Sequence, residues 1–136
     1  MISTEIQIRF ADVDMGGHVH NAAYLHYFES ARIGFFVGGL GTNWDWKKFG
    51  FIVKKNTIEY HVPVYLTDQI KVEVNCIHIG EKSFTLSYHV FDQKKVLKTY
   101  GESVIVCLDY HQNKTISIPA EVKQILLTHF NGQNPA

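Results

Sequence analysis

Residues 21–37 constrain the fold more than any other part of the sequence. Large side chains recur there at the three- and four-residue spacing of an α-helix, in the series Tyr24, Tyr27, Phe28, Ala31 and Phe35. The polar side chains form only a narrow stripe, made up of His26, Glu29, Ser30 and Arg32. A helix this apolar must be covered by other elements. We therefore expect one long, mostly buried helix that begins with Asn21 as its N-cap and ends at Gly38 and Gly39.

The remainder of the sequence predicts strands. Apolar and polar residues alternate over 5–10, 57–62, 70–76 and 84–90, and a further long strand is predicted over 96–108, with Gly101 as a bulge. Short turns at 80–82 and 92–94 predict that neighbouring strands are antiparallel. Residues 115–118 predict an edge strand, and residues 119–130 predict a terminal helix that opens near Pro119.

This order of elements indicates an α+β fold. The apolar helix needs a large surface to cover it, so we expect an antiparallel sheet of five to six strands wrapped around the helix. The 136 residues are enough for one domain, and we expect a single domain over 1–136 with a frayed tail over 131–136.

Composition excludes several classes of partner. Thirteen basic residues balance thirteen acidic ones, so the chain has no electrostatic footprint for nucleic acid or for an anionic membrane. No apolar run is long enough to span a bilayer, and residues 1–5 show no signal-peptide pattern. The two cysteines, Cys76 and Cys107, lie in strand-like segments and are expected to be buried free thiols. We expect a cytoplasmic protein.

The loop over residues 12–21 concentrates the chemistry of the chain. It places Asp12 and Asp14, two glycines and two histidines directly before the apolar helix. A helix N-terminus offers free N–H groups and a partial positive charge. Such donors can polarise a carbonyl and hold an oxyanion while a carboxylate attacks or activates water. The alternative is a turn whose aspartates accept hydrogen bonds from backbone N–H groups.

This loop resembles the signature of the 4-hydroxybenzoyl-CoA thioesterase family, in the run FADVDMGGHVHNAAY over 10–24 continued by YFESAR over 27–32. The segments IEYHVP over 58–63, TDQI over 67–70 and KSF over 82–84 fit the family as well. The resemblance covers nearly the whole chain. It implies a hotdog fold and an acyl-CoA thioesterase, which hydrolyses an acyl- or aryl-CoA to the free acid and CoA. No cofactor is implied, because coenzyme A is part of the substrate.

The resemblance also implies roles for single residues. The family's catalytic carboxylate falls on Asp14, as nucleophile or general base, whereas Asp12 is the structural member that caps the loop. The backbone N–H of Asn21 is expected to polarise the thioester carbonyl. Several relatives carry a histidine at this position, and some carry a tyrosine where this chain has Phe10. Gly16, Gly17 and His20 are expected around the substrate.

Further contacts follow from the same resemblance. Tyr24 matches a helix tyrosine that contacts substrate or belongs to the core. Lys82 and Ser83 align with a turn near the nucleotide end of coenzyme A. The family joins two sheets edge to edge, so we expect a homodimer or homotetramer with the active site between subunits. His61 of a second subunit would then line the pocket.

Other sites are disfavoured by the sequence. His18 and His20 alternate as metal ligands can, but no third ligand is placed to help them, so we expect no metal. Neither cysteine has a glycine-rich turn or a helix start to activate its thiol. The sequence contains no Gly-x-Ser-x-Gly elbow, phosphate loop or dinucleotide fingerprint.

Two other functions remain open besides the thioesterase. A hotdog dehydratase or hydratase would pair a loop histidine with a helix acid, for which His20 and Glu29 are available, although the prolines of the dehydratase loop are missing. A non-catalytic module that binds acyl-thioesters would use Asp14 only structurally. The acyl group, and the choice between CoA and acyl carrier protein as thiol, are not specified by the sequence.

Overall fold

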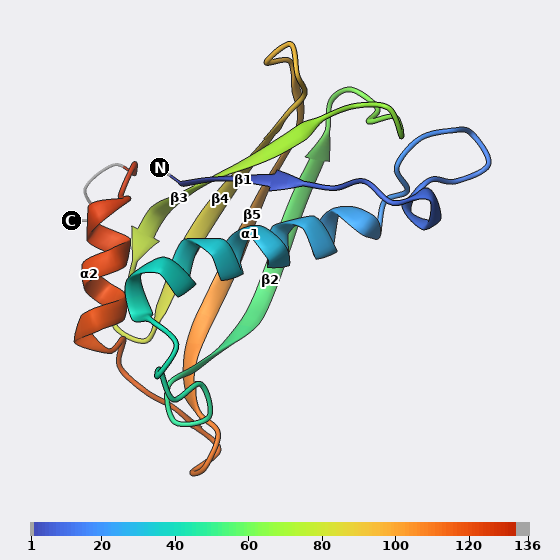
Figure 1. Cartoon of the computed structure of the whole chain (residues 1–136). Helices are drawn as coiled ribbons and strands as arrows, with labels where there is room; N and C mark the ends of the chain where they lie inside the picture. Colours follow the sequence, from blue (N-terminus) through green and yellow to red (C-terminus); the bar gives the residue numbers. More distant parts are fainter. Residues whose placement is uncertain (1, 133–136) are drawn as a thin grey trace.

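The computed structural model describes residues 2–132, which form an α+β fold with one antiparallel sheet of six strands and two α-helices (Figure 1). The elements in chain order are β1 (Ile2–Ile6), the 3-10 turn η1 (Phe10–Asp12), α1 (Ala23–Leu40), β2 (Gly50–Tyr60), β3 (Ile70–Ile79), β4 (Ser83–Phe91), β5 (Leu97–Asp109), β6 (Lys114–Thr115) and α2 (Ala120–Thr128). The strands are ordered β1-β3-β4-β5-β2, with the short β6 beside β5. This order makes β2 an edge strand.

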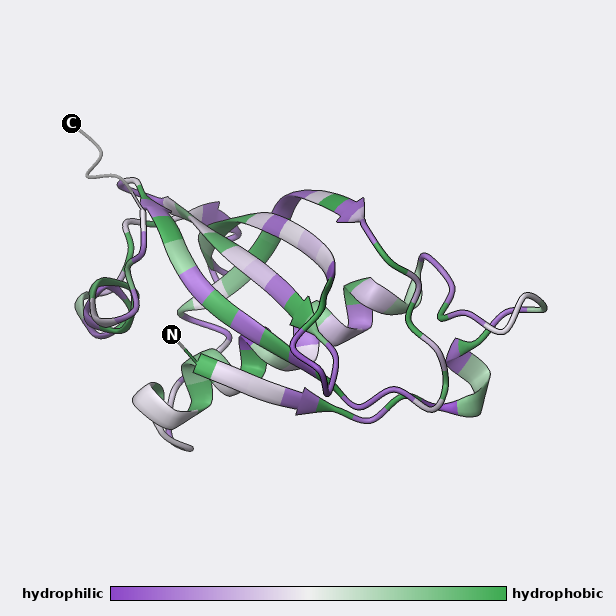
Figure 2. Ribbon diagram, turned by 90° about the horizontal axis from the view of Figure 1, so that it is seen from above, coloured by the Kyte–Doolittle hydropathy of each residue, from purple (hydrophilic) through white to green (hydrophobic). Residues whose placement is uncertain are grey.

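The core lies between α1 and one face of the sheet, which the helix crosses in Figure 1. Alternation along the strands produces this face, and Figure 2 shows it as green and purple bands that follow one another along each strand. Phe28 of α1 stacks on Tyr88 of β4 with ring centroids 4.3 Å apart, and both side chains are fully buried. Gly101 of β5 makes room for this pair, because a Cβ there would lie 2.5 Å from the ring of Phe28.

Helix α1 differs from the prediction at both ends. It begins at Ala23 with Ala22 in the N-cap position, and it continues past Gly38 and Gly39 to Leu40. The chain leaves the helix at Gly41, whose φ of +77° is a conformation that glycine adopts readily. The expectation of a mostly buried helix is not confirmed within this chain. Seven residues of α1 are buried, but Leu25, Ile33 and Val37 are 40%, 55% and 43% exposed.

Several strand predictions are also corrected. The first strand covers Ile2–Ile6, not 5–10, because its partner β3 begins at Ile70, opposite Ile6. The chain beyond it has no partner strand to lie on, so Phe10 enters η1 and is 85% exposed. Gly101 is not a bulge, since it pairs in register with Ile58. The register shifts lie instead between residues 53 and 55, 76 and 78, and 90 and 91.

Other predictions are confirmed. The turns at 80–82 and 92–94 join antiparallel neighbours, β3 to β4 and β4 to β5. Pro119 precedes the first turn of α2, and both cysteines are buried and free. Among residues 2–132, neither helix has the length and apolar character that crossing a bilayer requires. The tail expected over 131–136 lies, from residue 133 on, outside the described residues.

Candidate active site

The loop that precedes α1 is a tight hairpin closed around the Asp14 carboxylate. Val13 and Val19 pair across it, and the Asp14 N–H donates to the His18 carbonyl at 2.8 Å. Asp14 Oδ1 accepts hydrogen bonds from the N–H groups of Gly16 at 2.9 Å and His18 at 3.3 Å. Gly17 turns the chain with a φ of +81°. Asp14 is exposed, and within residues 2–132 its Oδ2 atom has no hydrogen-bond partner, so it is free to meet a ligand or water.

Asp12 is held differently. Its Oδ2 accepts hydrogen bonds from the Tyr27 hydroxyl at 2.8 Å and from the Arg9 N–H at 3.0 Å. Burial of Asp12 acts to raise the pKa of its carboxyl, but these two hydrogen bonds, together with the nearby Arg9 and His20, outweigh burial and lower it. The same contact, together with burial, raises the pKa of Tyr27. Asp12 thus ties the start of the loop to α1 and caps η1, the structural task that was expected of it.

Asn21 does not cap α1, which corrects the sequence prediction. It lies in a turn two residues before the helix, and among the described residues its side chain makes no hydrogen bond. The turn is closed by backbone instead, since the Ala23 N–H donates to the His20 carbonyl at 3.1 Å. Within residues 2–132 the N–H of Asn21 has no acceptor either, and the residue is exposed. A free donor therefore stands just before α1, two residues after the Val13–Val19 pair that closes the Asp14 hairpin.

Tyrosines connect this end of α1 to the end of β2. The Tyr60 hydroxyl donates to the Asn21 carbonyl at 3.2 Å, and the Tyr60 ring meets Tyr24 edge-on at 5.1 Å. Tyr24 is only 2% exposed, and burial raises its pKa, which favours the core interpretation of this residue. His61, the next residue after β2, is exposed and lies 3.6 Å from Glu59. Its contact with substrate stays a prediction.

Lys82 and Ser83 are not brought to the Asp14 hairpin. They follow the turn at the far end of β3, where the neighbouring Glu81 carbonyl accepts the Ile118 N–H ahead of α2. The Asp14 hairpin instead contacts Tyr65, ahead of β3. The ten residues of β3 span about 30 Å, so these groups lie at opposite ends of the molecule, as α2 and the hairpin do in Figure 1. A role of Lys82 and Ser83 toward CoA stays a prediction and would need a second subunit.

An apolar cavity of about 400 Å³ opens beside the second half of α1. Its lining combines apolar residues of the helix with aromatic and aliphatic residues of the sheet and the loop before β2, namely Ile33, Phe36, Val37, Trp46, Phe51, Val53 and Ile105. Glu29 and Arg32 add the only charges. Arg32 donates to the Tyr88 hydroxyl at 3.2 Å, so its guanidinium is anchored to β4. The cavity suits an apolar group of moderate length.

The structure bears on three alternatives: a dehydratase pair, a cysteine nucleophile and a metal site. His20 and Glu29 do not contact each other in the described chain, and Glu29 lies about 9 Å along α1 from its first residue. Burial raises the pKa of the Cys76 thiol to about 11 and that of Cys107 to about 12, so neither is an activated nucleophile. No three side chains of His, Cys, Asp or Glu gather as metal ligands within residues 2–132.

Sequence reasoning missed two parts of this region. Tyr60 was expected only as an alternating strand residue, and its hydroxyl contact with Asn21 joins positions 39 residues apart, which no local pattern indicates. The cavity was missed because its residues come from three separate segments. A signal for it does exist, since Ile33 and Val37 widen the apolar surface of the helix beyond what one sheet face can cover.

The chain resembles thioesterases in sequence and shares its fold with solved structures. Residues 8–126 match the family described as the thioesterase-like superfamily. The acyl-CoA thioesterase YbgC of Haemophilus influenzae is 29% identical over 126 residues, covering 89% of this chain and 90% of that protein. The long-chain acyl-CoA thioesterase FadM of Escherichia coli is 26% identical, covering 92% and 96%. The crystal structure of the PA5185 protein of Pseudomonas aeruginosa superposes with a TM-score of 0.89 at 21% identity, covering 98% and 94%.

Proposed function

Because this chain belongs to the thioesterase-like superfamily, we propose that it is an acyl-CoA thioesterase that uses Asp14 to hydrolyse the thioester. The observation that supports the proposal is the Asp14 hairpin, which exposes a carboxylate and is followed two residues later by the free N–H of Asn21. The names of the relatives YbgC and FadM support the acyl-CoA substrate.

The reaction divides between these two groups. The Asn21 N–H donates a hydrogen bond to the thioester oxygen, where negative charge develops as the carbonyl carbon becomes tetrahedral. Asp14 acts as general base, taking a proton from water as the water oxygen bonds to the carbonyl carbon, or as nucleophile, forming an anhydride that water then hydrolyses. In both routes the carbon–sulfur bond breaks, the thiolate leaves as CoA and is protonated, and the acid is released. Gly16, Gly17 and His20 border the same space.

The acyl chain occupies the apolar cavity beside α1. In one chain this cavity lies along the second half of the helix, whereas Asp14 precedes the first half. We propose that a homodimer joins the two, with β2 edges paired antiparallel. The cavity contacts the beginning of β2 through Phe51 and Val53, and the Asp14 end contacts the end of β2 through Tyr60. Antiparallel pairing brings the end of one β2 beside the beginning of the other. His61 of the second subunit then borders the shared site.

Thioester hydrolysis by the wild type and the Asp14→Asn variant tests the proposal. Released thiol is followed with short, medium, long and aromatic acyl-CoAs, and with an acyl carrier protein thioester. The substitution keeps the shape of the side chain and removes its charge, so we expect kcat to fall about 100-fold or more. Hydrolysis at the wild-type rate would remove Asp14 from the mechanism. Absence of hydrolysis by the wild type, with acyl-CoA binding retained, would instead favour the binding module.

A further inference from the structure

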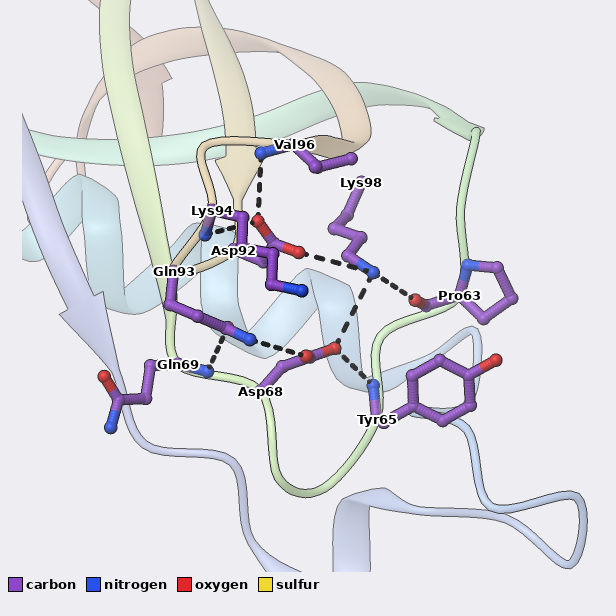
Figure 3. Close-up of polar contacts among 9 residues, drawn as sticks. All are labelled: Pro63, Tyr65, Asp68, Gln69, Asp92, Gln93, Lys94, Val96 and Lys98. Carbon is purple, nitrogen blue, oxygen red and sulfur yellow. Dashed lines mark hydrogen bonds and ion pairs between the residues drawn. The ribbon is translucent and has the colours of Figure 1, made fainter.

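Lys98, Asp68 and Asp92 form a largely buried ion cluster, separate from the residues assigned to the reaction. Lys98 of β5 is only 6% exposed, and its ammonium stands 3.6 Å from Asp92 and 3.8 Å from Asp68 (Figure 3). The same ammonium donates a hydrogen bond to the Pro63 carbonyl at 3.0 Å. The two carboxylates are nearly as buried as the lysine, with side chains 7% and 11% exposed. Charged side chains with so little exposed area are rare and must be matched closely by their partners.

Both carboxylates are fixed in place by further hydrogen bonds. Asp92 Oδ1 accepts the N–H groups of Lys94 and Val96, each at 2.9 Å, and the bond from Val96 leads the contacts that lower the pKa of Asp92. Asp68 Oδ2 accepts the Tyr65 N–H at 2.9 Å. Lys98 is therefore held between the turn that joins β4 to β5 and the segment over 61–69.

Gln93 adds a second link between the same two segments. Its side-chain carbonyl accepts the Gln69 N–H at 3.0 Å, and its amide reaches Asp68 at 3.5 Å (Figure 3). The backbone of Lys98 contributes as well, since its carbonyl accepts the N–H groups of His61 at 2.9 Å and Val62 at 3.0 Å. Segment 61–69 is thus joined to β5 and to the turn between β4 and β5 by both side-chain and backbone bonds.

The Asp14 hairpin rests on this segment. The Val19 N–H donates to the Val64 carbonyl at 2.8 Å, and His18 pairs with Tyr65, with ring centroids 5.1 Å apart. The N–H of His18 also donates one of the two hydrogen bonds that the Asp14 carboxylate accepts. The contacts run without a gap from Lys98 through segment 61–69 to Asp14.

From this path we propose that Lys98, with Asp68 and Asp92, is a positioning cluster that sets the orientation of the Asp14 carboxylate for thioester hydrolysis. The inference rests on the proposed function of Asp14. Its physical basis is that Pro63 and Tyr65, which contact Lys98 and Asp68, flank Val64 in the chain. A small displacement of a reacting group is enough to slow catalysis strongly. Lys98 touches no reacting atom.

Four variants separate positioning from stability. Lys98→Met removes the ammonium but leaves two buried carboxylates without their cation, which endangers folding. The triple variant Lys98→Met, Asp68→Asn, Asp92→Asn removes all three charges at similar volume and is expected to keep the melting temperature near that of the wild type. Lys98→Arg keeps the charge and the hydrogen-bond donors. Lys71→Met, which breaks an exposed ion pair with Glu5, is the matched control.

We expect kcat of the triple variant to fall about tenfold or more, with KM changed far less. Lys98→Arg is expected to retain most of the wild-type kcat, and Lys71→Met is expected to leave kcat unchanged. Amide hydrogen exchange provides a readout independent of activity. The Asp14 and Val19 N–H groups should exchange faster in the triple variant, while those of β3 and β4 stay protected.

A folded triple variant with wild-type kcat and wild-type exchange at Asp14 and Val19 would overturn the inference. Faster exchange in a protein whose wild type hydrolyses no thioester would uphold the positioning of the hairpin and reject the proposed function alone. A fall in kcat that is accompanied by a lower melting temperature in every cluster variant, Lys98→Arg included, would show that the cluster only stabilises the fold. This result would also overturn the inference.

Discussion

Asp12 and Asp14 stand two residues apart, yet their surroundings assign them different tasks. Asp12 accepts hydrogen bonds from the Tyr27 hydroxyl and the Arg9 N–H, so its carboxylate is occupied by contacts within the protein. Asp14 uses one oxygen to close its own hairpin and leaves the other unpartnered within the described chain. The contrast explains why the carboxylate proposed for catalysis is the more exposed of the two.

The lowered pKa of Asp12 predicts an effect of acid on stability. A carboxyl whose pKa is lower in the folded state stabilises the fold above the unfolded value of 3.8, and this stabilisation is lost as the pH falls through the folded value. Asp12→Asn should therefore be less stable than the wild type near pH 7, and the difference should shrink below about pH 4. Urea unfolding from pH 7 to pH 2.5 measures it. A difference that is constant over this range would contradict the explanation.

Gly101 should tolerate no side chain. A Cβ there would lie 2.5 Å from the Phe28 ring, which is stacked on Tyr88 and cannot move freely. Gly101→Ala is expected to lower the free energy of unfolding by about 1–3 kcal/mol. Gly38→Ala is the matched control, because a Cβ at this helix position meets nothing within 4 Å. The control should raise the free energy of unfolding by up to about 1 kcal/mol. Urea unfolding measures the free energy of unfolding of both variants. Equal changes in the two variants would contradict the packing argument.

At the scale of elements, α1 and the central strands were predictable because each is specified by a local period. Their ends were not. Asn21 is a good capping residue by type, but the turn before α1 is closed by backbone, which residue type does not indicate. The first strand ends where its partner β3 begins, a fact set by pairing and not by alternation. The Lys98 cluster was unpredictable for the same reason, since its carboxylates lie 30 and 6 residues away and look like ordinary turn aspartates.

The cavity beside α1 predicts acyl-chain selectivity. Val37→Trp places a large side chain into the cavity, so kcat/KM for a long acyl-CoA should fall about tenfold more than for a short one. Leu25→Trp is the matched control, because Leu25 is an exposed apolar residue of the same helix that does not line the cavity. Equal losses for long and short chains in Val37→Trp would show that the acyl group lies elsewhere.

At the scale of the whole molecule, the proposed active site joins two regions that lie apart within one chain. The Asp14 hairpin and the cavity lie at different ends of α1, and β2 is an edge strand with one side free in the described chain. The unpaired N–H and C=O groups of an edge strand can pair with a strand of another chain. The proposed dimer uses that edge to place the cavity of one subunit beside the carboxylate of the other, which makes the active site a property of the pair.

Complementation between two impaired variants tests this claim most directly. Asp14→Asn and Val37→Trp are mixed in equal amounts, unfolded and refolded together, and assayed on a long acyl-CoA. Half of the dimers should be mixed, and each mixed dimer has one site with both an intact carboxylate and an intact cavity. The mixture should therefore show about a quarter of the wild-type rate, well above either variant alone. A rate no higher than the average of the two variants, with mixed dimers detected by native mass spectrometry, would contradict the shared site.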